Sequence, residues 1–413
     1  MPEVSFSGLV VVAAVAFLAP LTLGLAPRLR LPAVVLEIVT GIIIGPSGLG
    51  WVELDLPIEI LSVVGLAFLL FLAGLEVELE RFMGRFLQKA VLGLLTSFAL
   101  GLALSLGLGA VGLVDTPLFV AIVLLATGLG LVIPFLRDAG ESSTDFGQLT
   151  IAGSAMADFG AVILLSLFFS REATGPGGQI LLLGSFGLLA AVVGVSIARA
   201  GRSMRISEAL TRLQDTTAQI RVRGAVLLMI GLVALAERFG LEVILGSFVA
   251  GVVLKLIDRD TMTHPHFQAK LDAIGFGFTV PVFFIASGLR FELGALFASG
   301  SGVLRIPLFL FALLIVRGVP AIFYRPLVGG RRALAAGFLQ ATSLPFIVAA
   351  SQIGMELGVI DEVTGAGLVA AGLLSVLFFP LVGLGVLRGA QQDSPRPQPT
   401  DLVSAGGDNS RTT

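Results

Sequence analysis

The sequence contains no cysteine, and only 13% of its 413 residues are charged. The absence of cysteine excludes disulfide bonds and thiolate metal sites. The scarcity of charge excludes a soluble protein made of packed helices, because such helices need charged outer faces. Histidine is also rare. His264 and His266 share one short loop with a proline between them, which indicates a solvated loop rather than a metal site.

Most of the chain is apolar: 56% of its residues are hydrophobic, and the mean hydropathy is +1.00. A helix needs about 20 apolar residues to cross a hydrocarbon core of roughly 30 Å, and such runs recur along the chain. The sequence therefore predicts an all-α polytopic membrane protein. We expect thirteen transmembrane helices, near residues 4–26, 33–50, 57–76, 90–113, 117–138, 146–169, 179–198, 222–238, 241–257, 271–289, 303–325, 332–354 and 363–387.

The basic residues alternate between the two sides that these runs define. One side carries most of the Lys and Arg, whereas the other carries only Arg171, Arg238, Arg290 and Arg305. Under the positive-inside rule the basic side is cytoplasmic. The N-terminus is then outside and the C-terminus in the cytoplasm, which agrees with an odd number of spans.

Residues 1–388 are expected to form one transmembrane unit. The N-terminus lacks the features of a cleaved signal peptide, so the first apolar run should be retained. The basic loop 199–221 has an amphipathic register and is either a helix on the membrane surface or a plain loop. Residues 389–413 are polar and predict a disordered cytoplasmic tail, and we expect no nucleotide-binding domain after it.

Two charged side chains stand inside apolar runs. Asp158 lies near the middle of its run, where a carboxylate needs a partner, a proton or a cation. A structural hydrogen bond between helices, or a misplaced boundary, is the alternative for Asp158. Arg317 keeps its proton under essentially all conditions and could hold Asp158 ionised or neutralise helix ends. The alternative for Arg317 is that its side chain extends to the cytoplasmic interface.

Two runs contain matching interruptions. The segments 125–130, followed by Pro134, and 340–345, which ends in a proline, both carry Ala-Thr-small-Leu, at corresponding places in the two halves. This pattern predicts inverted repeats with two discontinuous helices that cross in mid-membrane, where unwound carbonyls and helix ends are available to a cation. Asp158 and Arg317 have opposite charges, as needed to compensate those helix ends. Ordinary kinks at Pro and Gly are the alternative.

Other features call for more modest interpretations. The segment 107–112 matches a dinucleotide-binding pattern by letter, but it lies in an apolar run without a preceding strand, so we assign it to helix packing or to a span end. Gly41 and Gly45 are spaced as a packing face of small residues. Glu37 and Glu76, near span ends, are either structural or part of an entry funnel.

The chain resembles the second monovalent cation:proton antiporter family. The resemblance covers about residues 5–388 and rests on four highly specific segments, at 30–50, 70–76, 245–251 and 281–288. It implies the sodium/proton antiporter fold, a homodimer embedded in lipid, a panel of dimerisation helices, and a six-helix core that includes about 90–169 and 303–388. It also implies transport by an elevator-like movement of that core, in the service of pH homeostasis at a bacterial plasma (inner) membrane.

The resemblance also implies roles for individual residues. Asp158 matches the aspartate that alternately binds a metal cation, sodium or potassium, and a proton. Arg317 matches the intramembrane basic residue that compensates charge. Thr127 matches the Thr of the first discontinuous helix, and Thr342 and Ser343 match the second. Apart from the resemblance, we add Gly128 and Ser154 to the candidate ion-binding residues, with Glu37, Glu76 and Gln340 as accessory candidates.

Ala157 departs from the family pattern, in which electrogenic sodium exchangers carry a second Asp, electroneutral ones often Asn, and potassium systems often Gln. With one titrating acid, we expect electroneutral exchange of one cation for one proton. Sodium/proton exchange is the first reading and potassium/proton exchange the second. A gated cation channel or a non-transporting sensor is an alternative of another class. An enzyme is not expected, nor a cofactor beyond the transported ions, nor a nucleic-acid partner.

Overall fold

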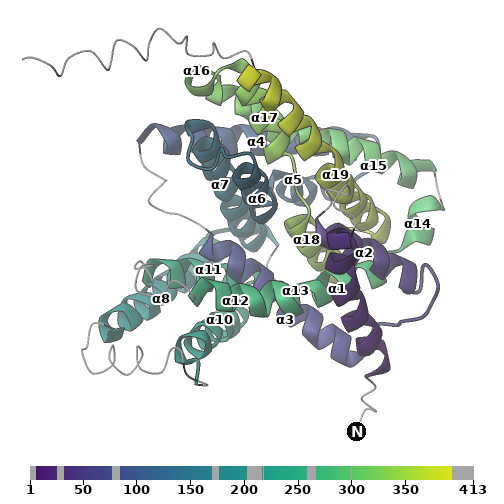
Figure 1. Cartoon of the computed structure of the whole chain (residues 1–413), viewed down its shortest axis with the longest axis vertical. Coiled ribbons are helices and arrows are strands. Elements are labelled where there is room, and N and C mark those ends of the chain that lie inside the picture. Colours follow the sequence, from purple (N-terminus) through teal and green to yellow (C-terminus); the bar gives the residue numbers. More distant parts are fainter. Residues whose placement is uncertain are drawn as a thin grey trace, which may run out of the picture.

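The computed structural model describes residues 6–25, 32–76, 84–169, 176–201, 216, 218–257, 267–298 and 300–392. Over these ranges the regular structure is entirely helical (Figure 1). The prediction of an all-α polytopic membrane protein is confirmed. Most of the basic loop, residues 202–215 and 217, lies outside the described residues, as do both histidines and residues 393–413.

Each of the thirteen predicted spans coincides with a helix or with consecutive helical segments. Ten of them are long and apolar enough to cross a membrane by length and composition. The other three are α2 (Ala33–Ile44) and α11 (Val243–Ile257), which are shorter, and α10 (Ile220–Arg238), which carries charges near both ends. The last helix, α19 (Glu362–Gln392), runs four residues past the predicted boundary at 388.

The helices pack in two groups (Figure 1). The first, which we term the crossing group, comprises α4 (Gly84–Ala110), α5 (Pro117–Leu125), α6 (Leu129–Asp138), α7 (Asp145–Phe168), α14 (Leu293–Phe297), α15 (Gly300–Leu313), η3 (Leu314–Gly318), η4 (Val319–Tyr324), α16 (Arg325–Val328), α17 (Gly330–Gln340), α18 (Pro345–Glu356) and α19. The second, the flanking group, comprises α1 (Ser7–Leu25), α2, α3 (Leu56–Leu75), α8 (Pro176–Gly201), α10, α11, α12 (Phe267–Ile274), η2 (Gly275–Thr279) and α13 (Val280–Leu289).

Paired glycines bring the flanking helices into backbone contact. A Cβ on Gly41 of α2 would lie 2.3 Å from the carbonyl oxygen of Ile285 on α13, and a Cβ on Gly288 would be equally close to the carbonyl of Ile38. A Cβ on Gly74 of α3 would likewise lie 2.2 Å from a carbonyl oxygen of α11. The packing face predicted at Gly41 is therefore confirmed, and it follows the close-approach logic of membrane helices.

Two helices widen into single π-helical turns just before a proline. Pro281 follows η2, and Pro320 follows η3. A proline ring clashes with the carbonyl four residues earlier, and a wider turn relieves that clash. Arg317 lies in η3, the second of these turns.

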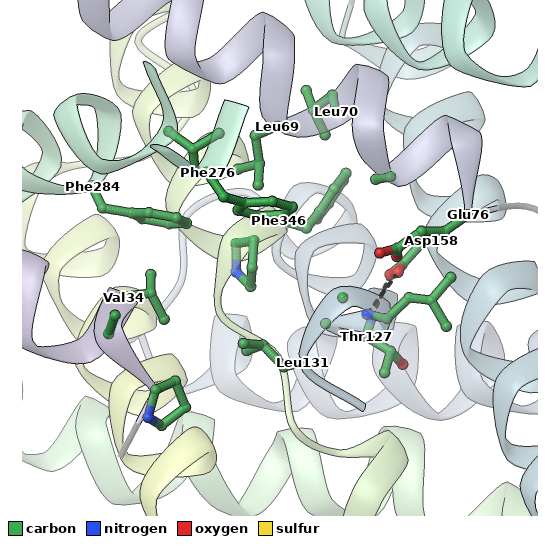
Figure 2. Close-up of a pocket in the computed structure, with 18 of the residues that line it drawn as sticks. Val34, Leu69, Leu70, Glu76, Thr127, Leu131, Asp158, Phe276, Phe284 and Phe346 are labelled. Carbon is green, nitrogen blue, oxygen red and sulfur yellow. Dashed lines mark hydrogen bonds between the residues drawn. The ribbon is translucent and has the colours of Figure 1, made fainter. Parts of the chain in front are cut away.

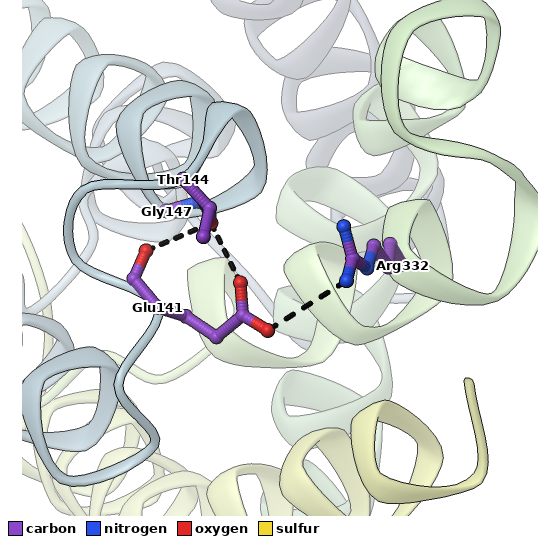
Figure 3. A network of polar contacts seen from close by, with 4 residues as sticks. All are labelled: Glu141, Thr144, Gly147 and Arg332. Atoms are coloured by element: carbon purple, nitrogen blue, oxygen red, sulfur yellow. Dashed lines mark hydrogen bonds and ion pairs between the residues drawn. The ribbon is translucent and has the colours of Figure 1, made fainter. Parts of the chain in front are cut away.

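A buried acid, Glu141, connects the segment between α6 and α7 to α17 (Figure 3). Glu141, only 4% exposed, follows α6; its carboxylate accepts a hydrogen bond of 2.6 Å from Thr144 and lies 3.8 Å from the guanidinium of Arg332 on α17. Thr144 also caps α7 by accepting from the backbone N–H of Gly147. This network fixes the start of α7, the helix that carries Asp158, against α17.

The segment 107–112 forms the end of α4 and the turn after it, where Gly112 has a φ of +72°. Neither a strand nor a nucleotide-binding turn is present at this place. The interpretation of this segment as helix packing or a span end is therefore confirmed.

Candidate ion-binding site

The two predicted interruptions meet. Helix α5 ends at Leu125 and α6 begins at Leu129, while α17 ends at Gln340 and α18 begins at Pro345. The backbone N–H of Gly128 in the first gap donates a hydrogen bond of 2.8 Å to the carbonyl of Thr342 in the second. The chain therefore has two discontinuous helices that touch at their unwound centres.

The first gap stays open because its N–H groups have partners elsewhere. Thr127 N–H donates to Asp158 Oδ1 at 2.6 Å, and Leu129 N–H donates to Asp158 Oδ2 at 3.3 Å. Together with Gly128, three successive amides are thus bonded outside their own helix. Buried amides are nearly always hydrogen-bonded, and these contacts replace the hydrogen bonds that a continuous helix would have made here.

The second gap is held by a serine on α19. Ser375 Oγ accepts a hydrogen bond from the N–H of Ser343 at 3.1 Å, and its single hydroxyl proton lies within reach of two carbonyl oxygens, that of Gly372 at 2.7 Å and that of Ser343 at 3.0 Å. Pro345 has no N–H to satisfy and begins α18. The Ser343 hydroxyl itself is buried and has no hydrogen-bond partner in the part of the chain that the structure describes.

Asp158 lies midway along α7 and faces a cavity of about 270 Å³ (Figure 2). The cavity is also lined by Thr127, Gly128, Glu37 and Glu76, and apolar side chains of both helix groups close it. Five of the predicted residues therefore surround one space. A carboxylate beside unwound backbone offers the oxygen ligands that a hard cation prefers, and the same carboxylate can take a proton.

Arg317 is buried at 2% exposure and does not extend to the interface. Its guanidinium donates from Nε to Thr127 Oγ1 at 2.8 Å, from Nη1 to Ser97 Oγ at 3.0 Å and from Nη2 to the Gly153 carbonyl at 3.2 Å. Within the described part of the chain, Arg317 and Asp158 form no ion pair. Thr127 connects them, since its side chain accepts from Arg317 and its backbone N–H donates to Asp158.

The charges match the helix ends that they meet. Asp158 binds the amino end of α6, where the helix dipole is positive. Thr127 Oγ1, which accepts from Arg317, lies 2.9 Å from the carbonyl of Gln340 at the carboxyl end of α17, where the dipole is negative. Asp158 therefore contacts its helix end directly, whereas Arg317 is linked to the end of α17 only through Thr127, and charge compensation by Arg317 stays a prediction.

The remaining predicted residues lie behind the cavity. Thr342 contributes its backbone carbonyl, and its hydroxyl bonds to Phe338 within α17. The Gln340 side chain points to α7 and to Tyr324 and does not line the cavity. Ser154 is buried one turn before Asp158, and its hydroxyl has no hydrogen-bond partner within the described ranges.

Three residues that support the site were not predicted from the sequence. Ser97 and Gly153 receive the Arg317 guanidinium, and Tyr324 accepts from Gln340 at 3.0 Å. Tyr324 is the only tyrosine of the chain and is buried, which could have been a signal. Ala157 is fully buried and does not line the cavity, so its small side chain fits the packing of α7.

Comparison with known proteins places this architecture in a family. A family model described as the transmembrane sodium/hydrogen exchanger matches residues 13–384. YjbQ from Bacillus subtilis is 32% identical over 396 residues, which are 92% of this chain and 63% of YjbQ, so the chain spans less than two thirds of that relative. The Na(+)/H(+)-K(+) antiporter GerN from Bacillus cereus is 28% identical over 276 residues, 64% of this chain and 67% of GerN.

A solved structure shares the fold. The sodium proton antiporter MjNhaP1 from Methanocaldococcus jannaschii superposes with a TM-score of 0.66 at 17% identity, over 92% of this chain and 98% of MjNhaP1. The predicted antiporter fold and the resemblance to monovalent cation:proton antiporters are thereby confirmed. The protein is a multi-pass membrane protein. The chain belongs to the transmembrane sodium/hydrogen exchanger family.

Proposed function

We propose that the protein exchanges sodium for protons and that Asp158 is the site for which the two ions compete. One observation carries the proposal: both Asp158 oxygens accept from backbone amides of the unwound segment, while the carboxylate faces the cavity. When Asp158 is protonated or holds a cation, its negative charge is neutralised, and moving it through the protein costs little free energy. The bare carboxylate anion costs much more to move. The movement of Asp158 across the membrane is therefore coupled to the binding of a cation or a proton.

Exchange should be electroneutral, with one cation for one proton. Arg317 keeps its proton, and its three hydrogen bonds go to Thr127, Ser97 and Gly153 and not to Asp158. It therefore does not exchange a proton with the site during the cycle. A dependence of turnover on membrane potential would contradict this stoichiometry.

The two helix groups suit an elevator-like movement. We assign the crossing group to the mobile core and the flanking group to the panel that stays in place and forms the homodimer. The glycine contacts between α2 and α13 and between α3 and α11 support a rigid panel. Exposed apolar side chains on α8, such as Ile180, Leu181 and Leu188, suit contact with lipid.

The cavity supports an inward-facing state. It is lined by Pro32 and Ala33 at the start of α2 and by Glu76 after the end of α3. In the sequence these ends adjoin Arg28, Arg30 and Arg81, which the positive-inside rule places in the cytoplasm. We therefore place the protein in a bacterial plasma membrane with its N-terminus outside, its C-terminus inside and Asp158 open to the cytoplasm.

Potassium/proton exchange is the second candidate. Ala157 lacks the polar side chain that sodium exchangers carry, and the relative GerN is described as acting on both cations. A gated channel differs from both exchangers because it would move cations without obligatory proton counterflow.

The proposal is tested in proteoliposomes that contain a pH-sensitive dye and receive sodium, lithium, potassium or rubidium. We expect sodium to release trapped protons in the wild type, and Asp158→Asn to abolish the signal for every cation. Normal exchange by Asp158→Asn would overturn the site. A potassium response larger than the sodium response would select the second candidate, and cation flux without proton movement would select a channel.

A further inference from the structure

We propose that Glu76 supplies a second carboxylate to the transported cation in the cytoplasm-facing state only, so that cation affinity differs between the two faces of the membrane. This inference rests on the proposed exchange at Asp158. It extends that proposal with a binding residue that lies outside the crossing group.

Glu76 meets Asp158 at the first turn of α6. Leu129 N–H donates to Asp158, and a Cβ built on the next residue, Gly130, would lie 3.7 Å from each carboxylate oxygen of Glu76. Glycine at 130 leaves this space free. Both acids line the same cavity, and Figure 2 shows their carboxylates close together at one end of it.

One oxygen of Glu76 has no partner among the described residues. Oε2 is buried and accepts no hydrogen bond from them, whereas both oxygens of Asp158 accept hydrogen bonds from backbone amides. A buried carboxylate oxygen without a donor is unfavourable unless something positive reaches it. A cation bound by Asp158 at this end of the cavity would meet that requirement.

The two acids belong to different helix groups, of which we propose that one moves and the other stays in place. Glu76 directly follows α3, which is locked to α11 because a Cβ on Gly74 or Gly251 would lie within 2.2 Å of a carbonyl oxygen on the other helix. Asp158 is bonded to the backbone of the crossing group. When the crossing group carries Asp158 toward the other face, Glu76 stays behind with α3. The second carboxylate therefore acts on one face of the membrane.

A directional measurement tests this. Sodium-dependent exchange is measured in everted vesicles, where added sodium reaches the cytoplasmic face, and in right-side-out vesicles, where it reaches the outer face, both from cells without other sodium/proton antiporters. For Glu76→Gln we expect the KM for sodium to rise about tenfold or more in everted vesicles, because a nearby unit charge is lost at low effective dielectric. In right-side-out vesicles the KM should change less than about twofold, since Glu76 is then distant and screened.

Two further variants sharpen the result. Glu76→Asp keeps the charge and should recover most of the cytoplasmic affinity. Glu59→Gln removes an exposed acid from the opposite end of α3 and should leave the everted-vesicle KM near that of the wild type. Equal KM changes at both faces, or no change at either, would overturn the role of Glu76 while leaving exchange at Asp158 intact. Exchange that survives Asp158→Asn would instead refute the proposed function.

Discussion

Thr127 connects Arg317, Asp158 and the end of α17 through its hydroxyl and its backbone N–H. The substitution Thr127→Val tests how much the candidate site depends on the hydroxyl. Thr127 is 1% exposed; its hydroxyl accepts from Arg317 Nε at 2.8 Å and lies 2.9 Å from the Gln340 carbonyl, to which it donates. Valine has nearly the same shape but lacks the hydroxyl. The backbone N–H of residue 127 can still donate to Asp158, so the variant separates the Arg317 link from the carboxylate itself.

The magnitude follows from the two partners that lose the hydroxyl. A hydrogen bond to a charged group contributes about 1.5–3 kcal/mol, and a buried carbonyl left without a donor costs about 1–3 kcal/mol. Arg317 keeps its hydrogen bonds to Ser97 and Gly153, so the guanidinium does not lose all its partners and the loss of stability is smaller than the full sum. We expect Thr127→Val to lower the free energy of unfolding by about 2–4 kcal/mol.

The assay is a denaturant titration of the purified protein in detergent, followed by exchange measurements in proteoliposomes. Thr127→Ser retains the hydroxyl and is the matched control, with a free energy of unfolding near that of the wild type and measurable exchange. Thr127→Val should lose stability and most of its exchange rate. A Thr127→Val protein as stable and as active as Thr127→Ser would refute the idea that this hydroxyl connects Arg317 to the unwound segments.

Two further substitutions address the support around the site. In Gly153→Ala, the new Cβ would lie 2.1 Å from Tyr324 Oη and 2.3 Å from Gln340 Nε2, so we expect a loss of about 1–3 kcal/mol in unfolding free energy, measured against Gly184→Ala, where the added Cβ meets open space. Glu141→Gln removes the charge that faces Arg332 at 3.8 Å and should lower stability by no more than about 1 kcal/mol, without changing the order of cation preference. A changed preference in Glu141→Gln would show that this network does more than hold α7 against α17.

Much of the architecture was accessible from the sequence because lipid imposes simple rules. The apolar runs predicted every span, and the repeated Ala-Thr-small-Leu segments predicted the two gaps, since backbone at that depth must be paired or line a cavity. Intramembrane charge alone singled out Asp158 and Arg317. The partners of Arg317 could not be read in this way, because Ser97 and Gly153 are small residues of a kind that is common in transmembrane helices and gain meaning only from the fold.

The direction of the side chains was also beyond the sequence. Gln340 and Thr342 lie in the predicted gap region, yet the Gln340 amide points to Tyr324, and Thr342 contributes a carbonyl and not its hydroxyl. Glu76 stood out only as an acid at a span end. Its place beside Asp158 depends on how α3 packs against α11, and that contact is made by Gly74 and Gly251, far apart in the sequence.

The central claim is that one carboxylate binds either a cation or a proton, and proton release on sodium binding measures this directly. Sodium is titrated by calorimetry into the purified protein at constant pH, in buffers of different ionisation enthalpy, so that the number of protons released per bound cation is obtained. The account predicts about one proton per sodium for the wild type and neither sodium binding nor proton release for Asp158→Asn. Sodium binding without proton release in the wild type, or unchanged release in Asp158→Asn, would contradict it.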